Sequence, residues 1–311
     1  MTAVTALRVG TRASALARAQ TGAVVTALGL DALGLDVSTV AISTEGDRSS
    51  AALAQIGGTG VFVSALRDAL AGGRIDVAVH SYKDLPVAVD DRVHVAAVPV
   101  RGDARDVLVA RDGLTLGELP DGARVGTGSP RRAAQLRALG LGLDVVAVRG
   151  NVDTRLAMVS SGAMDAVVLA HAGLARLGRV DEVTEVLDPL QMLPAAGQGA
   201  LAVECRAVDA ATTALLAPLD DVDTRAVVTA ERSVLRGLEA GCSSPVGALG
   251  EIGEGDDGPE IYLRASVTAL DGSDAVRLSR TGSITDADAI GRWLATDLLA
   301  AGADKIMERS T

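Results

Sequence analysis

Short apolar runs alternate with longer amphipathic stretches through the first two thirds of the chain. Runs rich in Val and Ile predict strands, whereas apolar positions spaced three and four residues apart predict helices. Near the N-terminus this pattern predicts strands at residues 7–10, 36–43 and 76–80, and helices at 14–28 and 62–71. Because strands alternate with helices, we expect a mostly parallel sheet with helices on both faces.

The alternation starts again after residue 105. It predicts strands at 106–110, 124–126, 144–148, 165–169 and 201–204, and helices at 130–139, 152–160 and 172–177. Linker-like segments at 101–105 and 194–199 enclose this second unit. Paired crossings of this kind indicate that the second domain is inserted into the first, with both crossings as hinges. Ligands of such folds lie beyond the carboxyl ends of the strands, in a cleft.

The pattern changes near residue 221. A helix is predicted at 224–238, strands at 262–269 and 276–282, and a final helix at 286–301, which indicates a small α+β domain. We therefore predict an α/β protein of three domains. The first α/β domain comprises residues 1–100 and 200–220, the inserted α/β domain comprises 101–199, and the α+β domain comprises 221–311.

Composition narrows the class of protein. The chain has 311 residues, enough for several domains, and its net charge of −11 argues against nucleic acid as a partner. We expect neither a signal peptide nor a membrane span, because no apolar segment reaches roughly 20 residues. Two distant cysteines form no disulfide framework, which favours the cytoplasm. The cysteines and histidines show no metal-ligand spacing, so no metal site is predicted.

The segment 126–132 has the features of an anion site. After the strand and Thr127, Ser129 is suited to the N-cap of a helix and Pro130 to its first position. Free N–H groups there favour an anion, and the forked donors of Arg131 and Arg132 match carboxylates. The third glycine of the dinucleotide fingerprint is missing. A capped surface helix with solvated arginines is the alternative interpretation.

Other arginines occupy similar positions. Arg149 ends the strand at 144–148, Arg155 lies in the next helix, and Arg12 and Arg176 lie at comparable places in other strand–helix units. Because ligands gather beyond strand ends, we expect one pocket for a molecule with several carboxylates or phosphates. An enzyme acting on nucleotide phosphates is a weaker interpretation, since the fingerprint is absent.

Residues 80–86 follow the strand at 76–80 and place Lys83 and Asp84 at the rim of the cleft. One interpretation is a solvated ion pair that contributes little to stability. The other is functional: a carboxylate in a cleft stabilises a cation formed during reaction, or transfers protons. His80 fits a structural role as well as a catalytic one.

Cys242 lies in a loop of small residues, 241–247, where Gly, Ser and Pro mark an exposed turn. It is the candidate nucleophile, whereas Cys205 at a strand end is typical of a buried, inert cysteine. Residues 44–60 form a long polar connection of the kind seen in lids or in disordered segments. Phe62, the only phenylalanine, follows this connection and either packs in the core or stacks on a flat ligand.

Together these segments resemble the porphobilinogen deaminase (hydroxymethylbilane synthase) family over almost the whole chain. The order and spacing of the matching segments are specific; these segments are 10–14, 80–86, 126–132, 149–155, 193–199 and 241–247. The resemblance implies a monomeric transferase of tetrapyrrole (porphyrin and haem) biosynthesis. It also implies that the first two domains are like periplasmic binding proteins.

The resemblance also implies roles for individual residues. Cys242 would hold a dipyrromethane cofactor through a thioether, and Asp84 matches the catalytic aspartate. Positions that match cofactor-binding residues are Ser81, Lys83, Asp84, Thr127, Ser129, Arg131, Arg132 and Arg149. Positions that match residues binding the substrate or the growing chain are Arg12, Ser14, Phe62, Arg149, Arg155 and Arg176.

The implied reaction joins four porphobilinogen molecules head to tail on the enzyme-bound primer. Each molecule loses ammonia to give a cation that the terminal pyrrole attacks, and water finally releases hydroxymethylbilane. Asp84 would stabilise cationic pyrrole nitrogens while the arginines neutralise carboxylates. Thr59 replaces a lysine common in relatives, so contacts of the lid differ. The alternative function is a non-catalytic, two-lobed protein that binds a polycarboxylate and needs neither Cys242 nor Asp84.

Overall fold

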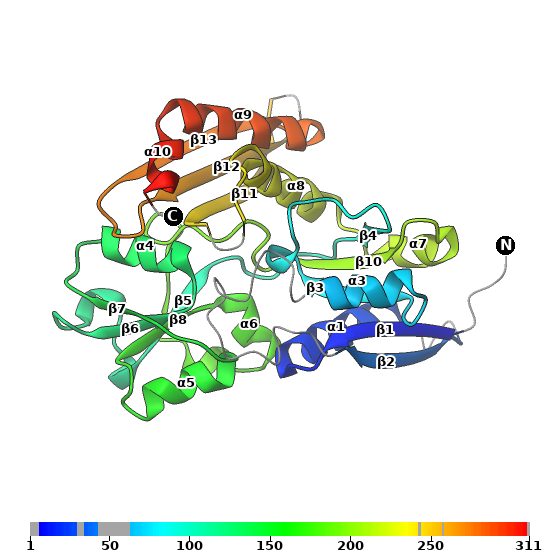
Figure 1. The fold of residues 1–311 in the computed structure, drawn as a ribbon, viewed down its shortest axis with the longest axis horizontal. Helices are drawn as coiled ribbons and strands as arrows, with labels where there is room; N and C mark the ends of the chain where they lie inside the picture. Colours follow the sequence, from blue (N-terminus) through cyan, green and yellow to red (C-terminus); the bar gives the residue numbers. More distant parts are fainter. Residues whose placement is uncertain (1–5, 30–33, 43–62, 242–243, 257, 310–311) are drawn as a thin grey trace. The chain divides into compact units, whose positions relative to one another are not determined.

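The computed structural model describes residues 6–29, 34–42, 63–241, 244–256 and 258–309 (Figure 1). The chain forms two compact units: Met1–Gly102 with Ala200–Arg225, and Asp103–Gly199 with Ala226–Thr311. Two of the crossings between units lie at the linker-like segments predicted from the sequence. The inserted and C-terminal domains belong to the same unit, and the division into three domains stays a prediction.

A five-stranded sheet forms the middle of the first unit. Its strands, in spatial order, are β2 (Asp36–Ile42), β1 (Ala6–Arg12), β3 (Val77–Ser81), β10 (Leu201–Arg206) and β4 (Val93–Ala97). β1 pairs in parallel with β2 and β3, whereas β10 runs antiparallel to β3 and β4. The helices are α1 (Ala15–Leu28), α3 (Ser64–Ala71) and α7 (Ala210–Leu216). The core is built from small and aliphatic side chains such as Leu7, Val79 and Val203, as a chain with few aromatics requires.

The second unit contains another five-stranded sheet. Its strands are β7 (Asp144–Ala147), β6 (Arg124–Thr127), β8 (Ala166–Ala170), β5 (Asp106–Ala110) and β9 (Glu185–Val186). β6 pairs in parallel with β7 and β8, and β5 runs antiparallel to β8 and β9. A helix follows each parallel strand; these helices are α4 (Pro130–Ala138), α5 (Val152–Ser160) and α6 (His171–Arg176). The N-termini of all three helices therefore follow the carboxyl ends of parallel strands.

The C-terminal part of the second unit is a three-stranded antiparallel sheet with helices. The strands are β11 (Val246–Gly255), β12 (Gly258–Thr268) and β13 (Ala275–Ser283). The helices are α9 (Ala287–Ala300), α10 (Ala303–Glu308) and α8 (Val222–Gly237), which begins in the first unit and enters the second at Ala226. α9 packs against β12 and β13 and also lies close to α8. A Cβ at Gly291 of α9 would lie 2.2 Å from the carbonyl oxygen of Ala230, so glycine permits this approach.

The predicted class, α/β with a small α+β part, is confirmed, but the mostly parallel sheet was wrong. Each five-stranded sheet has two parallel and two antiparallel pairs. β5 and β10 each enter a sheet after a crossing between units, without the helical crossover that joins parallel neighbours. The sequence analysis also missed β4, β9, β11, α7 and α10.

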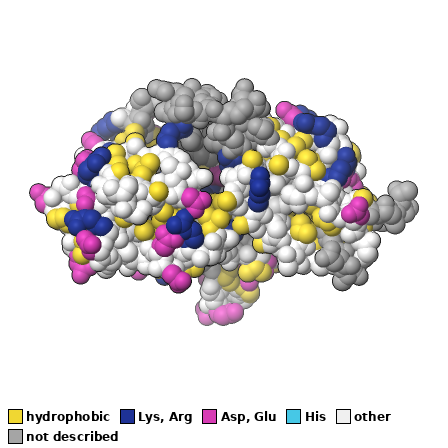
Figure 2. All heavy atoms as spheres, turned by 90° about the horizontal axis from the view of Figure 1, so that it is seen from below, with side chains coloured by type: hydrophobic (Ala, Val, Ile, Leu, Met, Phe, Trp, Pro, Cys, Tyr) yellow, Lys and Arg dark blue, Asp and Glu magenta, His cyan; other side chains and the backbone are white. Residues whose placement is uncertain are grey.

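Charge is dispersed over the face of the molecule that Figure 2 shows. Figure 2 shows basic and acidic side chains interspersed on one face, without a broad basic patch among the described residues. Within the described part of the chain, no helix combines the length and apolar character that crossing a membrane requires.

Candidate active site

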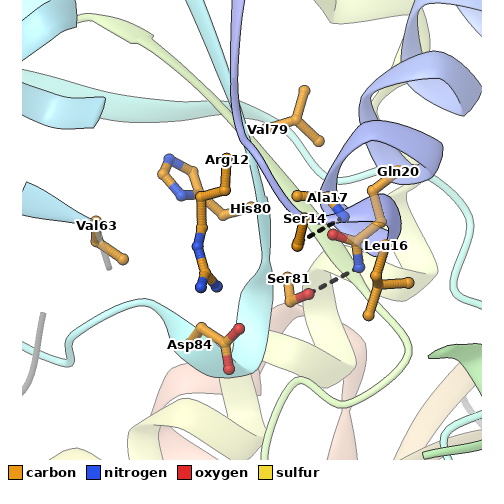
Figure 3. A pocket seen from close by; sticks show the side chains of 10 residues that line it. All are labelled: Arg12, Ser14, Leu16, Ala17, Gln20, Val63, Val79, His80, Ser81 and Asp84. Atoms are coloured by element: carbon orange, nitrogen blue, oxygen red, sulfur yellow. Dashed lines mark hydrogen bonds between the residues drawn. The ribbon is translucent and has the colours of Figure 1, made fainter. Parts of the chain in front are cut away.

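The carboxyl end of β3 presents the first group of candidate residues. β3 runs directly into a 3-10 turn at Tyr82–Asp84, which places Asp84 just beyond the strand. Because β1 pairs in parallel with β3, Arg12 ends its strand at the same edge. Figure 3 shows Arg12 and Asp84 pointing toward each other in a small pocket. The pocket is also lined by Ser14, Leu16, Ala17, Gln20, Val63, Val79, His80 and Ser81.

Hydrogen bonds hold one wall of this pocket in place (Figure 3). Ser14 is the N-cap of α1, and its hydroxyl accepts a bond from the Ala17 N–H at 3.3 Å. On the same helix the buried Gln20 donates from Nε2 to Ser81 Oγ at 2.8 Å. The structure thus brings Arg12, Ser14, Ser81 and Asp84 together, as the sequence predicts. Lys83 occupies the middle of the turn next to Asp84.

A buried ionic network lies behind the pocket. Glu204 on β10 is 1% exposed and accepts bonds from Arg67 at 2.6 and 3.1 Å; its Oε2 also lies 3.2 Å from His80 Nε2. Burial alone raises the pKa of Glu204, but the nearby His80 and the bonds from Arg67 outweigh it and lower the pKa to about 2. His80 therefore has a structural partner as well as a place in the pocket wall.

In the second unit, the turn from β6 to α4 has the capped geometry that the sequence predicts. Ser129 is the N-cap, its hydroxyl accepts from the Arg132 N–H at 3.5 Å, and Pro130 occupies the first turn. Thr127 Oγ1 in turn accepts from the Ser129 N–H at 3.2 Å. These bonds fix the direction of α4 and hence the positions of the arginines in its first turn.

The two arginines of this turn point inward rather than into solvent, which excludes the surface-helix alternative. Arg131 and Arg132 are 2% and 5% exposed, and both form ion pairs at 2.7 Å with Asp106, which is fully buried. Burial raises the pKa of Asp106, but the charges of Arg131 and Arg132 outweigh this and lower it to about 2. The structure therefore corrects the view of these arginines as freely presented donors, because an internal carboxylate holds both.

The other candidate site residues of the second unit are also cationic; they are Arg149, Arg155 and Arg176. Arg155 is partly buried, and its pKa is lowered by burial and by the like charges of Arg132 and Arg149. Arg149 is half-buried and has no ion-pair partner among the described residues. Arg176 donates to the Gly199 carbonyl oxygen at 2.5 Å, and burial lowers its pKa. Burying cations without counter-ions is costly, which indicates a place for an anion.

Two further observations indicate that carboxylates fit here. The Nε atoms of Arg131 and Arg155 are buried without a hydrogen-bond partner among the described residues. A Cβ at Gly128 would lie 2.7 Å from the Val148 carbonyl oxygen and 3.3 Å from Arg155 Nη2, so glycine leaves space beside this guanidinium. Arginines exceed acidic partners, and a ligand with acetate or propionate groups would satisfy the unused donors.

Some predicted site residues lie outside the described part of the chain. These are Cys242, Phe62 and the connection 44–60. Beside Cys242, Gly241 donates to Ser244 Oγ at 3.0 Å, and the Ser244 N–H bonds the Gly241 carbonyl oxygen. Cys205 is buried on β10 and burial raises the pKa of its thiol, which agrees with an inert role.

Sequence reasoning missed several residues that support the site. Asp106 opens a strand that is otherwise apolar, and an acidic residue at such a place was the available signal. Gln198 donates to Asp106 at 2.7 Å, and the side chain of Gln135 bonds both the N–H and the carbonyl of Leu193. These glutamines form their bonds with residues far along the chain, which no local pattern predicts.

Comparison with known proteins identifies the family. The model of the porphobilinogen deaminase dipyrromethane-cofactor-binding domain matches residues 7–214, and that of the porphobilinogen deaminase C-terminal domain matches 226–300. The chain belongs to the porphobilinogen deaminase family. It is 59% identical to the porphobilinogen deaminase of Mycobacterium tuberculosis strain H37Rv over 97% of this chain and 98% of that one. The Mycobacterium avium enzyme is 58% identical over 97% of this chain and 96% of its own.

Membership in the porphobilinogen deaminase family sets the class of chemistry. The chain is a transferase of porphyrin biosynthesis with a dipyrromethane cofactor, as the sequence predicts. Similar solved structures include the methionine-binding protein MetQ, with a TM-score of 0.45, 15% identity, and coverage of 69% of this chain and 89% of that one. A BvgS periplasmic domain of Bordetella pertussis has a TM-score of 0.40 and 18% identity, with coverage of 69% of this chain and 86% of that one. Scores this low establish no functional relation.

Proposed function

We propose that this chain condenses four porphobilinogen molecules, with loss of ammonia, on a dipyrromethane primer attached to Cys242, and releases hydroxymethylbilane by hydrolysis. The observation that supports this best is the excess of desolvated arginine charge in the second unit, where Arg149 and Arg155 have no carboxylate partner among the described residues. A ligand with several acidic groups suits such a site. When bound, the primer supplies a nucleophilic pyrrole carbon.

Each residue of the site has a defined task in this proposal. Ser129, Thr127, Arg131, Arg132 and Arg149 hold the carboxylates of the primer. Arg155 and Arg176, with Arg12 and Ser14 of the first unit, bind substrate and lengthening chain. These cations lower the repulsion between carboxylate groups that the reaction brings together.

Asp84 acts on the opposite charge. Loss of ammonia leaves the substrate cationic, and a carboxylate aimed at the forming charge stabilises it. Asp84 is the last residue of the 3-10 turn that also contains Lys83, and it lines the pocket together with Arg12 and Ser81. Asp84 also accepts protons when a new pyrrole regains its aromatic form. We propose that the enzyme works as a cytoplasmic monomer and needs neither a metal nor nucleic acid.

Intact mass is the decisive measurement. Wild-type protein incubated with porphobilinogen should gain the mass of two linked pyrrole units, and Cys242→Ser should gain none. A wild-type protein that stays unmodified would favour the two-lobed binding protein. If Cys242→Ser gained the added mass and Cys205→Ala did not, the assignment of Cys242 as the attachment site would be wrong.

Turnover tests the role of Asp84. Asp84→Asn should fold, attach the primer and slow turnover by roughly a hundredfold or more, the scale expected for losing a key electrostatic group. The matched control is Asp91→Asn, an exposed carboxylate of the same unit, which should leave turnover unchanged. Near-normal turnover of Asp84→Asn would exclude the assigned role.

A further inference from the structure

Asp106 is the one acidic residue, among those the structure describes, in contact with the arginine pair of α4. It is the first residue of β5 and pairs with Ala170, the last residue of β8. Since β5 runs antiparallel to β8, its beginning lies at the edge where the parallel strands end and their helices start. A fully buried carboxylate is thus located among groups that we assign to an anionic ligand.

The two oxygens of Asp106 are divided between the two arginines. Oδ2 accepts from Arg131 Nη2 at 2.7 Å, whereas Oδ1 accepts from Arg132 Nε at 3.0 Å and Nη2 at 2.7 Å. Gln198 Nε2 also donates to Oδ1 at 2.7 Å and to the Ala104 carbonyl oxygen. One carboxylate therefore fixes both guanidinium groups relative to each other.

The two arginines differ in the donors that remain. Arg132 also donates from Nη1 to the Val168 carbonyl oxygen at 3.1 Å and from Nη2 to Gln198 Oε1 at 3.3 Å. Each of its nitrogens thus has a protein partner. Arg131 donates from Nη1 to the Leu193 carbonyl oxygen, but its Nε has no partner among the described residues. The protein therefore engages more of the N–H donors of Arg132 than of Arg131, and Arg131 keeps more donors for a ligand.

Electrostatics alone argues against a carboxylate at this place. A buried negative charge repels the carboxylates of a ligand and cancels part of the attraction of the arginines. Its presence is explained if the gain from orienting two long, flexible side chains before binding exceeds the repulsion. We propose that Asp106 is a positioning residue that orients Arg131 and Arg132 for the carboxylates of the pyrrole chain; this rests on the proposed function.

The substitution Asp106→Asn distinguishes orientation of the arginines from repulsion of the ligand carboxylates, because the two effects change primer loading in opposite directions. Protein prepared without cofactor is titrated with porphobilinogen, and intact mass gives the loaded fraction. If orientation dominates, the variant should need at least roughly tenfold more porphobilinogen than the wild type for half of the protein to gain the primer mass. This is the usual scale for losing an outer partner of a binding group. If repulsion dominates, half-loading needs the same amount or less, and the proposal is overturned.

Asp165→Asn is the matched control for a general loss of stability. Asp165 precedes β8 at the opposite end of the sheet, and accepts bonds from the Arg124 N–H and Arg111 Nε, both at 2.7 Å. This variant should lower the melting temperature and leave loading as in the wild type. If Asp165→Asn impairs loading as much as Asp106→Asn, the role of Asp106 is merely structural.

Arg132→Lys keeps the proposal testable if Asp106→Asn does not fold. Lysine retains the charge but cannot make the forked contact with Asp106 and also reach the Val168 carbonyl oxygen. Loading should again require more porphobilinogen, although the net charge is unchanged. Wild-type loading of Arg132→Lys would overturn the proposal. If the wild-type protein itself never gains mass, the proposed function fails instead.

Discussion

Substitution of Glu204 by Gln removes the shared acceptor of a buried ionic network. The Glu204 side chain is 1% exposed, and its partners Arg67 and His80 have side chains 11% and 3% exposed. The glutamine side chain has a similar size but no charge, so the guanidinium would be left without its buried counter-ion. Breaking a buried pair in this way costs about 3–5 kcal/mol.

The pKa of Glu204 gives an independent magnitude. Folding lowers this pKa from 4.5 to about 2, since the nearby His80 and the bonds from Arg67 outweigh the opposing effect of burial. Each pKa unit corresponds to about 1.4 kcal/mol, so the ionised carboxylate stabilises the folded state by about 3 kcal/mol. The folded pKa is depressed, so this contribution is complete above the unfolded pKa of 4.5 and is lost as pH falls toward 2.

Urea unfolding of the wild type and Glu204→Gln at pH 7 and at lower pH tests both statements. We expect a free-energy difference of about 3 kcal/mol at pH 7 that narrows by about 1 kcal/mol near pH 3.5. Glu251→Gln is the control, because Glu251 is 55% exposed in its pair with Arg264 and should cost below about 1 kcal/mol. A pH-independent difference, or one no larger than that of the control, would refute the reasoning.

Three further substitutions test the second unit and the inert thiol. Arg155→Leu should reduce turnover strongly while raising stability slightly, because a desolvated cation is removed; unchanged turnover would exclude it from the site. Gly128→Ala should impair primer attachment, measured by intact mass, because its Cβ would lie 2.7 Å from the Val148 carbonyl oxygen. Its control, Gly22→Ala in α1, meets nothing within 4 Å and should stabilise by about 0.5–1 kcal/mol in urea. Cys205→Ala should attach the primer normally, and its free energy of unfolding should fall by about 1 kcal/mol because the contact between Cys205 Sγ and the Thr213 hydroxyl is lost. A Cys205→Ala protein without added mass would contradict this.

The sequence by itself determined much of the local structure and supplied the candidate residues of the site. Ser14, Ser129 and Asn151 cap helices because their side-chain oxygens reach an N–H three residues along the chain. Apolar runs between these caps gave the strands, and the strand ends placed Arg12 and Asp84 at one edge of a sheet. Such signals are short-ranged, so they can be recognised without knowledge of the partners.

Only the tertiary structure decided which charges meet. Asp106 lies 25 residues before Arg131, and Glu204 lies 137 residues after Arg67. β5 and β10 enter their sheets antiparallel, and this brings both carboxylates beside cations from other elements. A charged residue has many potential partners along the chain, and burial selects those whose geometry offsets the loss of water. For this reason the sequence offered the arginines as candidates, while packing decided that Asp106 holds both Arg131 and Arg132 and that Arg155 has no acidic partner among the described residues.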